Sequence, residues 1–246
     1  MIDKSKGIVL RVVKYGETSV IVAMYTERFG LQSYLVNGVR TSSKKNSAKG
    51  NLFQPAAILD LVVYHNDLKN LQRLKEFKWA YLYQQLFFNV LKNAVALFMV
   101  ELLTKSLKQP EPNSELFQFV ERSFIDLDGA HEAIVANYPL FFAIHLASYL
   151  GLRIHNNYSD QKSILDLREG SFVGDIPNHP DFLEGENSHV TSQLLRIADA
   201  GNLEKLKLNQ DKRRSLLFAY QTFYALHVQD FMALKTIPVL QAVLGD

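Results

Sequence analysis

Residues 19–36, SVIVAMYTERFGLQSYLV, decide the fold of this chain. Two runs rich in β-branched and aromatic residues, 19–26 and 31–36, flank a turn at residues 28–30. Runs of this composition, bounded by turn residues, predict β-strands. The stretch therefore predicts two consecutive strands joined by a short turn.

Three further runs extend this pattern outward. One precedes it at residues 7–13, and two follow it, at residues 56–64 after Pro55 and at residues 71–77. Five short strands punctuated by Gly and Pro predict a small barrel, and a five-stranded barrel of this length predicts an OB-fold over residues 1–80. The open face of such a fold suits single-stranded nucleic acid.

From about Trp79 the hydrophobic period changes from that of strands to that of helices. The pattern predicts an α+β fold whose second domain, residues 81–246, is all-helical. An insert at about residues 155–187 carries a predicted hairpin around Glu169-Gly170. Ser114 is the expected N-cap of the second helix. The predicted helices are 79–107, 115–126, 140–150, 190–200, 210–231 and 237–244.

Charge is distributed unevenly between the two predicted domains. Residues 1–80 carry 13 Lys and Arg against 6 Asp and Glu, whereas residues 81–246 carry 14 against 19. The basic first domain indicates a polyanionic partner, and nucleic-acid phosphate is the commonest polyanion. Residues 37–50 hold four basic residues and no acidic one, and we expect them to form a mobile surface loop.

Composition excludes several classes of protein. The chain has no Cys, so disulfides and thiolate metal sites are impossible, which fits a reducing cytoplasm. It has no stretch of about 18 uncharged apolar residues and no secretory signal pattern, so we expect a cytoplasmic protein. It lacks phosphate-loop, metalloprotease and hydrolase motifs, so we expect no catalytic residue and no cofactor.

Six short motifs follow one another along the first domain: Lys6-Gly7-Ile8-Val9-Leu10, Tyr15-Gly16-Glu17-Thr18-Ser19, Tyr25-Thr26-Glu27-Arg28-Phe29-Gly30, Asn37-Gly38-Val39-Arg40, Leu52-Phe53-Gln54-Pro55 and Leu71-Gln72-Arg73-Leu74-Lys75-Glu76. In this order and spacing they resemble the RecO family of bacterial recombination-mediator proteins. Farther on, Gly151 and the stretches 156–159 and 165–170 resemble a Cys-free branch of that family. The resemblance covers nearly the whole chain and is strongest over residues 6–80.

The resemblance implies an OB-fold followed by a helical domain in a non-enzymatic protein. Such proteins bind single- and double-stranded DNA and anneal complementary strands. They contact the acidic C-terminal tail of the single-strand binding protein, and with RecR they help to load RecA onto coated DNA. Many members hold zinc with four Cys in the insert. This chain has none, so we expect packing or a hairpin to hold the insert, from about Tyr158 to Glu186.

The candidate DNA-binding residues are basic residues of the first domain, one aromatic residue at a turn and a basic cluster in the long helix near the end. Lys and Arg neutralise phosphates, and Arg adds bidentate contacts. The competing interpretation is a solvated surface. The absence of acidic residues from the loop and the resemblance favour DNA contact for the four basic residues of the loop 37–50. For the basic cluster in the helix, contact with DNA and neutralisation by nearby acidic side chains are equally good interpretations. The candidates are Arg11, Lys14, Arg28, Phe29, Arg40, Lys44, Lys45, Lys49, Lys212, Arg213 and Arg214.

Other side chains have a structural interpretation that is at least as good as a functional one. Phe29 is the best base-stacking candidate because it lies at a turn, whereas Tyr25 and Tyr34 are as easily core residues. His155 and His179 lie in the insert near several Asp residues, but their spacing matches no compact metal-ligand motif, so we expect no metal site.

Two other classes of function are compatible with these residues. An RNA-binding OB-fold protein would prefer RNA to DNA at matched salt, since only RNA offers a 2′-hydroxyl. A protein scaffold whose basic loop meets an acidic partner would bind DNA negligibly near physiological salt. An enzyme is the least supported class because no catalytic constellation is present.

Overall fold

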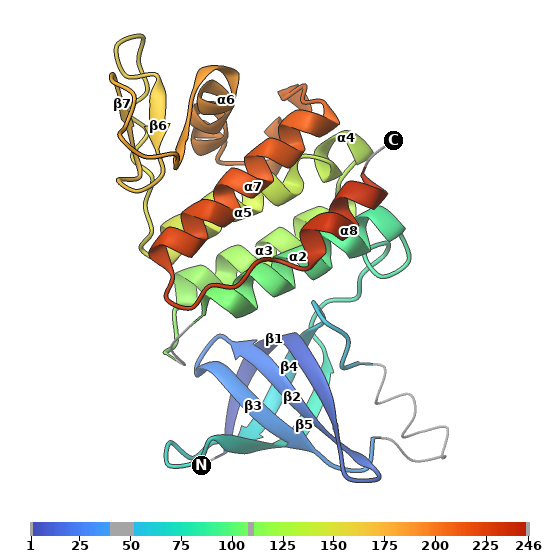
Figure 1. The fold of residues 1–246 in the computed structure, drawn as a ribbon. Coiled ribbons are helices and arrows are strands. Elements are labelled where there is room, and N and C mark those ends of the chain that lie inside the picture. The colour runs from blue at the N-terminus through green and yellow to red at the C-terminus, as the bar shows by residue number, and fades with distance from the viewer. Residues whose placement is uncertain (1, 40–51, 108–110, 245–246) are drawn as a thin grey trace. The chain divides into compact units, whose positions relative to one another are not determined.

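The computed structural model describes residues 2–39, 52–107 and 111–244 (Figure 1). Packing divides the chain into two compact units. The barrel unit comprises Met1–Gln84 and Leu107–Ile125, and the helical unit comprises Gln85–Ser106 and Asp126–Asp246. The boundary expected after residue 80 thus needs correction, because the segment that contains most of helix α3 (Ser114–Gly129) packs with the barrel.

The barrel unit is a closed five-stranded barrel with the strand order β1-β2-β3-β5-β4 (Figure 1). Neighbouring strands are antiparallel, except for β3 and β5, which pair in parallel and close the barrel. This arrangement confirms the predicted five strands and the predicted fold class. The strands are β1 (Ile2–Tyr15), β2 (Ser19–Thr26), β3 (Gly30–Val36), β4 (Ile58–Tyr64) and β5 (Leu71–Trp79).

Alternation along the strands builds the barrel core. In β2, Val22 and Met24 are fully buried, while the intervening Ala23 is only half-buried. Tyr25 and Tyr34 are also fully buried, so both are core residues. The Tyr25 hydroxyl donates to the carbonyl of Asn113 at 3.2 Å, just before α3 begins. The start of α3 therefore belongs to the hydrophobic core of the barrel unit.

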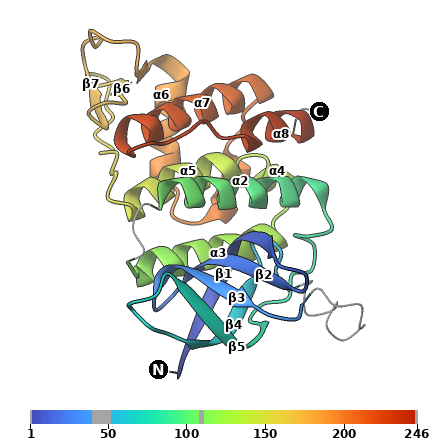
Figure 2. The same ribbon diagram turned by 60° about the horizontal axis from the view of Figure 1, so that its bottom comes forward.

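The helical unit is built around two apolar helices, α2 and α5. Nearly every residue of α5 from Tyr138 to Ala147 is buried, which explains why it has no polar face. Helix α5 packs against α2, α6 and α7, and α8 packs against α2, as Figure 2 shows. The helices of this unit are α2 (Val90–Ser106), α4 (Glu132–Val135), α5 (Tyr138–Tyr149), α6 (Gly185–Arg196), the 3-10 helix η1 (Ala200–Lys205), α7 (Gln210–His227) and α8 (Thr236–Val243).

Helix α2 begins at Val90, so the prediction of a helix from residue 79 is wrong. Trp79 ends β5 instead, opposite Leu59 of β4. The side chain of Asn89 accepts the N–H of Lys92 at 3.1 Å, which is the N-cap geometry that starts a helix. Helix α3 is likewise capped by Asn113, whose Oδ1 accepts the N–H of Leu116 at 2.9 Å, and not by the expected Ser114.

The insert contains the predicted hairpin, β6 (Ile164–Asp166) and β7 (Ser171–Val173), and a third strand, β8 (Phe182–Leu183), that was not predicted. The strand order is β7-β6-β8. Asp166 Oδ1 accepts the backbone N–H groups of Arg168 and Glu169 at 2.8 and 3.1 Å and so closes the hairpin turn. The Arg168 guanidinium pairs with Asp181 at 2.7 Å and ties the hairpin to the chain before β8. Hydrogen bonds and packing therefore hold the insert.

Within the described residues, no cluster of three or more His, Asp or Glu side chains could hold a metal ion. Nor is any helix in the described ranges long and apolar enough to cross a membrane.

Candidate nucleic-acid interface

One surface of the barrel is formed by the outward side chains of β1, β2, β3 and β5. Residues paired directly across neighbouring strands lie on the same side of a sheet. Arg11 is paired with Ala23, Ala23 with Ser33, and Ser33 with Leu71. These pairs form one row of outward side chains across all four strands. We call this surface the four-strand face. Its outward residues are Arg11, Val13, Tyr15, Ile21, Ala23, Ser33, Leu35, Leu71 and Arg73.

The four-strand face combines positive charge with exposed apolar surface. Its charged residues are Arg11 and Arg73, and no acidic residue is among those named above. Tyr15 is 52% exposed, and Val13 and Leu71, elsewhere on this face, are exposed as well. Guanidinium groups neutralise phosphates and aromatic rings stack on bases, so this combination suits single-stranded nucleic acid.

Arg73 lies on this face only because the barrel closes. It pairs in parallel with Leu35 of β3 and antiparallel with Tyr64 of β4. The sequence pattern predicted that Arg73 lies on a strand, but no pattern of neighbouring residues indicates which strands flank β5. We therefore missed Arg73 and Tyr64 as candidate residues, although both alternate with buried residues in their strands.

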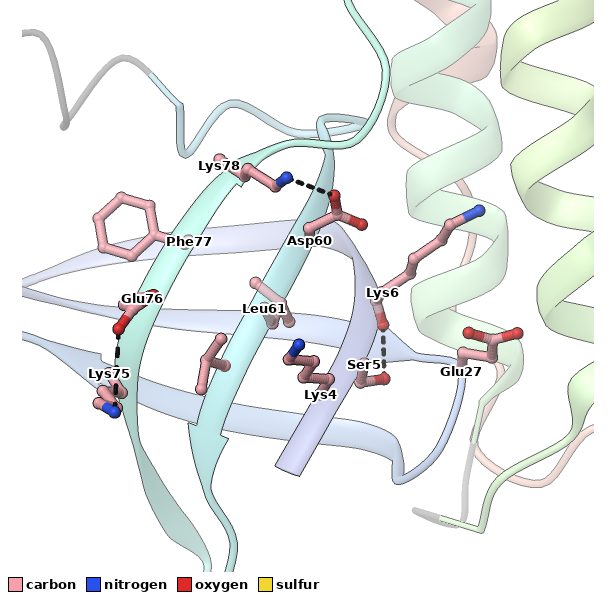
Figure 3. A pocket seen from close by; sticks show the side chains of 11 residues that line it. Lys4, Ser5, Lys6, Glu27, Asp60, Leu61, Lys75, Glu76, Phe77 and Lys78 are labelled. Carbon is pink, nitrogen blue, oxygen red and sulfur yellow. Dashed lines mark hydrogen bonds and ion pairs between the residues drawn. The ribbon is translucent and has the colours of Figure 1, made fainter. Parts of the chain in front are cut away.

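A second basic surface lies on the outer side of β1, β4 and β5, where a groove of about 810 Å³ contains Lys4, Lys6, Lys75 and Lys78 (Figure 3). Glu27, Asp60 and Glu76 line the same groove.

Most of these lysines already have carboxylate partners. Lys78 lies 3.6 Å from Asp60, and Lys75 lies 3.9 Å from Glu76. Lys6 donates to Glu121 at 2.8 Å, and this hydrogen bond raises the pKa of Lys6. Lys6 and Lys78 are thus paired, and three carboxylates line the groove, so it attracts phosphate less than the four-strand face does.

The structure places the candidate residues of the barrel unit in different settings. Arg11 is exposed on the four-strand face, and Lys14 is exposed near the end of β1. Arg28 is exposed too, but it donates to Asp3 at 3.1 Å. The half-buried ring of Phe29 is stacked on His65, with centroids 4.0 Å apart, so one of its faces is already covered. Arg40, Lys44, Lys45 and Lys49 lie outside the described residues.

The helical cluster is partly engaged in local contacts. Lys212 pairs with Glu186, and Arg213 donates to the carbonyl of Leu208 at 2.6 Å. Burial lowers the pKa of Arg213. Arg214 is exposed, with its guanidinium carbon 5.9 Å from the ring centroid of Phe218. Of the three residues, Arg214 is thus the most accessible to a partner.

The fold and this surface define a protein with an N-terminal OB-type barrel and a mainly helical C-terminal domain that carries a small three-stranded sheet. Two family models match this layout. The model described as "Recombination protein O N terminal" matches residues 1–83, and that described as "Recombination protein O C terminal" matches residues 88–235. The chain therefore belongs to the RecO family of DNA repair proteins.

Similar proteins extend over the full length of the chain. The chain is 31% identical over 245 residues to the DNA repair protein RecO of Christiangramia forsetii, with 100% of both chains covered. It is 32% identical over 245 residues to that of Bacteroides fragilis and 31% identical over 246 residues to that of Flavobacterium psychrophilum, with 98% of each chain covered.

Proposed function

We propose that this chain is a non-catalytic mediator of recombinational repair that binds single- and double-stranded DNA through its barrel unit. The four-strand face is the observation that supports the proposal. It presents Arg11, Arg73 and the exposed ring of Tyr15 among its outward side chains, and none of the outward residues named for it is acidic. Such a surface binds the phosphate backbone with little dependence on sequence.

Annealing follows from the same contacts. Two strands repel each other through their phosphates, and bound Lys and Arg side chains lower that repulsion. We propose that the chain anneals complementary strands in this way. We further propose that, with RecR, it helps to load RecA onto DNA coated with single-strand binding protein, which would place it at the nucleoid.

The helical unit offers a surface for a protein partner. Arg213 and Arg214 flank a small apolar hollow that Leu217 of α7 and Leu240 of α8 also line. An acidic peptide with an apolar end matches this combination of charge and apolar surface. We propose that the acidic tail of the single-strand binding protein binds here.

Fluorescence anisotropy of a labelled oligonucleotide, titrated from low to physiological salt, tests the DNA part of the proposal. We expect salt-sensitive binding that Arg11→Ala weakens and that Arg153→Ala, a change of an exposed arginine in the helical unit, leaves unaltered. A peptide copying the tail should bind without displacing the DNA. Absence of binding at low salt would favour the scaffold alternative, and tighter binding of RNA at matched salt would favour the RNA-binding alternative.

A further inference from the structure

A pocket of about 320 Å³ lies at the edge of the four-strand face, where β3 ends beside β5. Leu35, Tyr64, Arg73, Lys75 and Phe77 line it. Its volume is at the small end of the range of ligand pockets, roughly 300–1,000 Å³. The pocket is therefore suited to one small unit of a ligand and not to an extended segment.

The positive charge of this pocket has fewer carboxylates around it than that of the groove on β1, β4 and β5. None of the described residues that line the pocket is acidic. Arg73 is exposed and makes no ion pair with a described carboxylate. Lys75, which also lines the groove, lies 3.9 Å from Glu76, and both side chains are well exposed, so this pair is weak. Two cations are thus available to one anionic group.

An aromatic ring stands next to these cations. Tyr64 is 46% exposed and is paired directly with Arg73 across β4 and β5. Directly paired residues of neighbouring strands project on the same side, with their Cβ atoms about 5 Å apart. A group that meets the guanidinium of Arg73 is therefore within reach of the ring of Tyr64.

We propose that this pocket is a subsite for a single nucleotide of single-stranded DNA. Arg73 and Lys75 bind its phosphate, and its base stacks on Tyr64. The inference rests on the proposed DNA binding by the barrel and adds a defined place for one base. A base in a duplex is stacked between its neighbours and cannot reach the ring, so the subsite favours single strands.

Affinity measurements on the full chain test the two halves of the subsite separately. Tyr64→Ala should weaken binding of an oligothymidylate about fivefold or more, while Tyr64→Phe, which keeps the ring, should bind as the parent does. The Tyr64→Ala effect should vanish for an abasic oligonucleotide. Arg73→Ala should reduce the slope of log K against log salt by about 0.7, the value for one phosphate contact in a single strand. Thermal unfolding checks that each variant is folded.

Photo-cross-linking of an oligonucleotide that carries 5-iodouracil gives a direct readout. We expect mass spectrometry of the digested adduct to place the cross-link on Tyr64. If the parent chain binds DNA, but Tyr64→Ala has no effect and the cross-link lies elsewhere, the subsite is wrong and DNA binding by the barrel stands. If the parent chain binds no single-stranded DNA, the proposed function fails as well.

Discussion

The side chain of Gln72 and the backbone of Asn66 hydrogen-bond in both directions. Nε2 of Gln72 donates to the carbonyl of Asn66 at 2.8 Å, and its Oε1 accepts the Asn66 N–H at 3.0 Å. The same Nε2 donates to the carbonyl of Lys69 at 2.6 Å. Gln72 is only 3% exposed, so a buried amide on β5 fixes the loop between β4 and β5, next to Tyr64 and Arg73.

Replacing this amide should destabilise the barrel unit. Gln72→Ala leaves the backbone groups of Asn66 and Lys69 without their partners, and we expect the free energy of unfolding to fall by about 2 kcal/mol. Urea denaturation followed by circular dichroism measures the change. Gln161→Ala, at an exposed glutamine, is the control, and an equal loss in both variants would contradict the structural importance of Gln72.

Glu101 of α2 holds the start of α8. Its carboxylate accepts the N–H groups of Lys235 and Thr236, each at 2.9 Å, and the Thr236 hydroxyl at 2.7 Å, and it pairs with Lys105 at 2.8 Å. Burial raises the pKa of Glu101, but these hydrogen bonds outweigh burial and lower it to about 2.

The lowered pKa of Glu101 determines how its contribution to the stability of the chain depends on pH. Because the pKa is lower in the folded chain than its ordinary value of 4.5, the stabilisation by Glu101 is complete above about pH 4.5 and is lost as the pH falls toward 2. We expect Glu101→Gln to unfold about 2 kcal/mol more easily at pH 7 and to lose less stability between pH 4.5 and 2 than the parent. Denaturant titrations across that range measure it, with Glu204→Gln, at an exposed site, as the control. If the free energy of unfolding changed equally with pH in the parent and in Glu101→Gln, the assigned role of Glu101 would be wrong.

The insert should be stable without a metal ion. Asp166 is 6% exposed and accepts two backbone N–H groups, so Asp166→Ala should lower the free energy of unfolding by about 2 kcal/mol. Asp160→Ala, at an exposed aspartate, should change the free energy of unfolding little.

A chelator such as EDTA should leave the melting temperature of the parent unchanged, since the chain has no Cys to form a thiolate zinc site. A fall in melting temperature on adding EDTA would overturn this account.

The basic residues between β3 and β4 remain candidates for phosphate contacts. We expect combined replacement of Arg40, Lys44, Lys45 and Lys49 by Ala to weaken DNA binding and to make its salt dependence shallower, because fewer counterions are released on binding. Anisotropy titrations at several salt concentrations give the slope of log K against log salt. An unchanged slope would remove these four residues from the interface.

Local patterns were sufficient for most of the secondary structure. Residues 19–36 predicted two strands and a turn, and the structure has β2 and β3 there. Alternating apolar residues indicate which side of a strand is buried, and apolar residues at the helical period indicate which side of a helix is buried. Both patterns can be recognised within a few consecutive residues. The helix at residues 210–227 began where the sequence predicted and ended four residues earlier.

The start of α2 was not predictable in this way. The apolar residues from Trp79 onward resemble a helix, but Trp79 pairs with β4, and the backbone of Gln85 and Leu86 donates to Asp128, 43 and 42 residues away. A turn that is stabilised by a carboxylate far away in the sequence cannot be predicted from the residues of the turn itself.

The sequence by itself determined the order of the five barrel strands and of the longer helices, the basic character of the first domain and, through the absence of Cys, an insert without a thiolate metal site. Only the tertiary structure decided that α3 begins against the barrel and that Leu35, Arg73 and Tyr64 form one row. The physical reason is the range of the interactions. Hydrophobic period and turn chemistry act between near neighbours, whereas the closure of the barrel by β3 and β5 joins residues almost 40 positions apart.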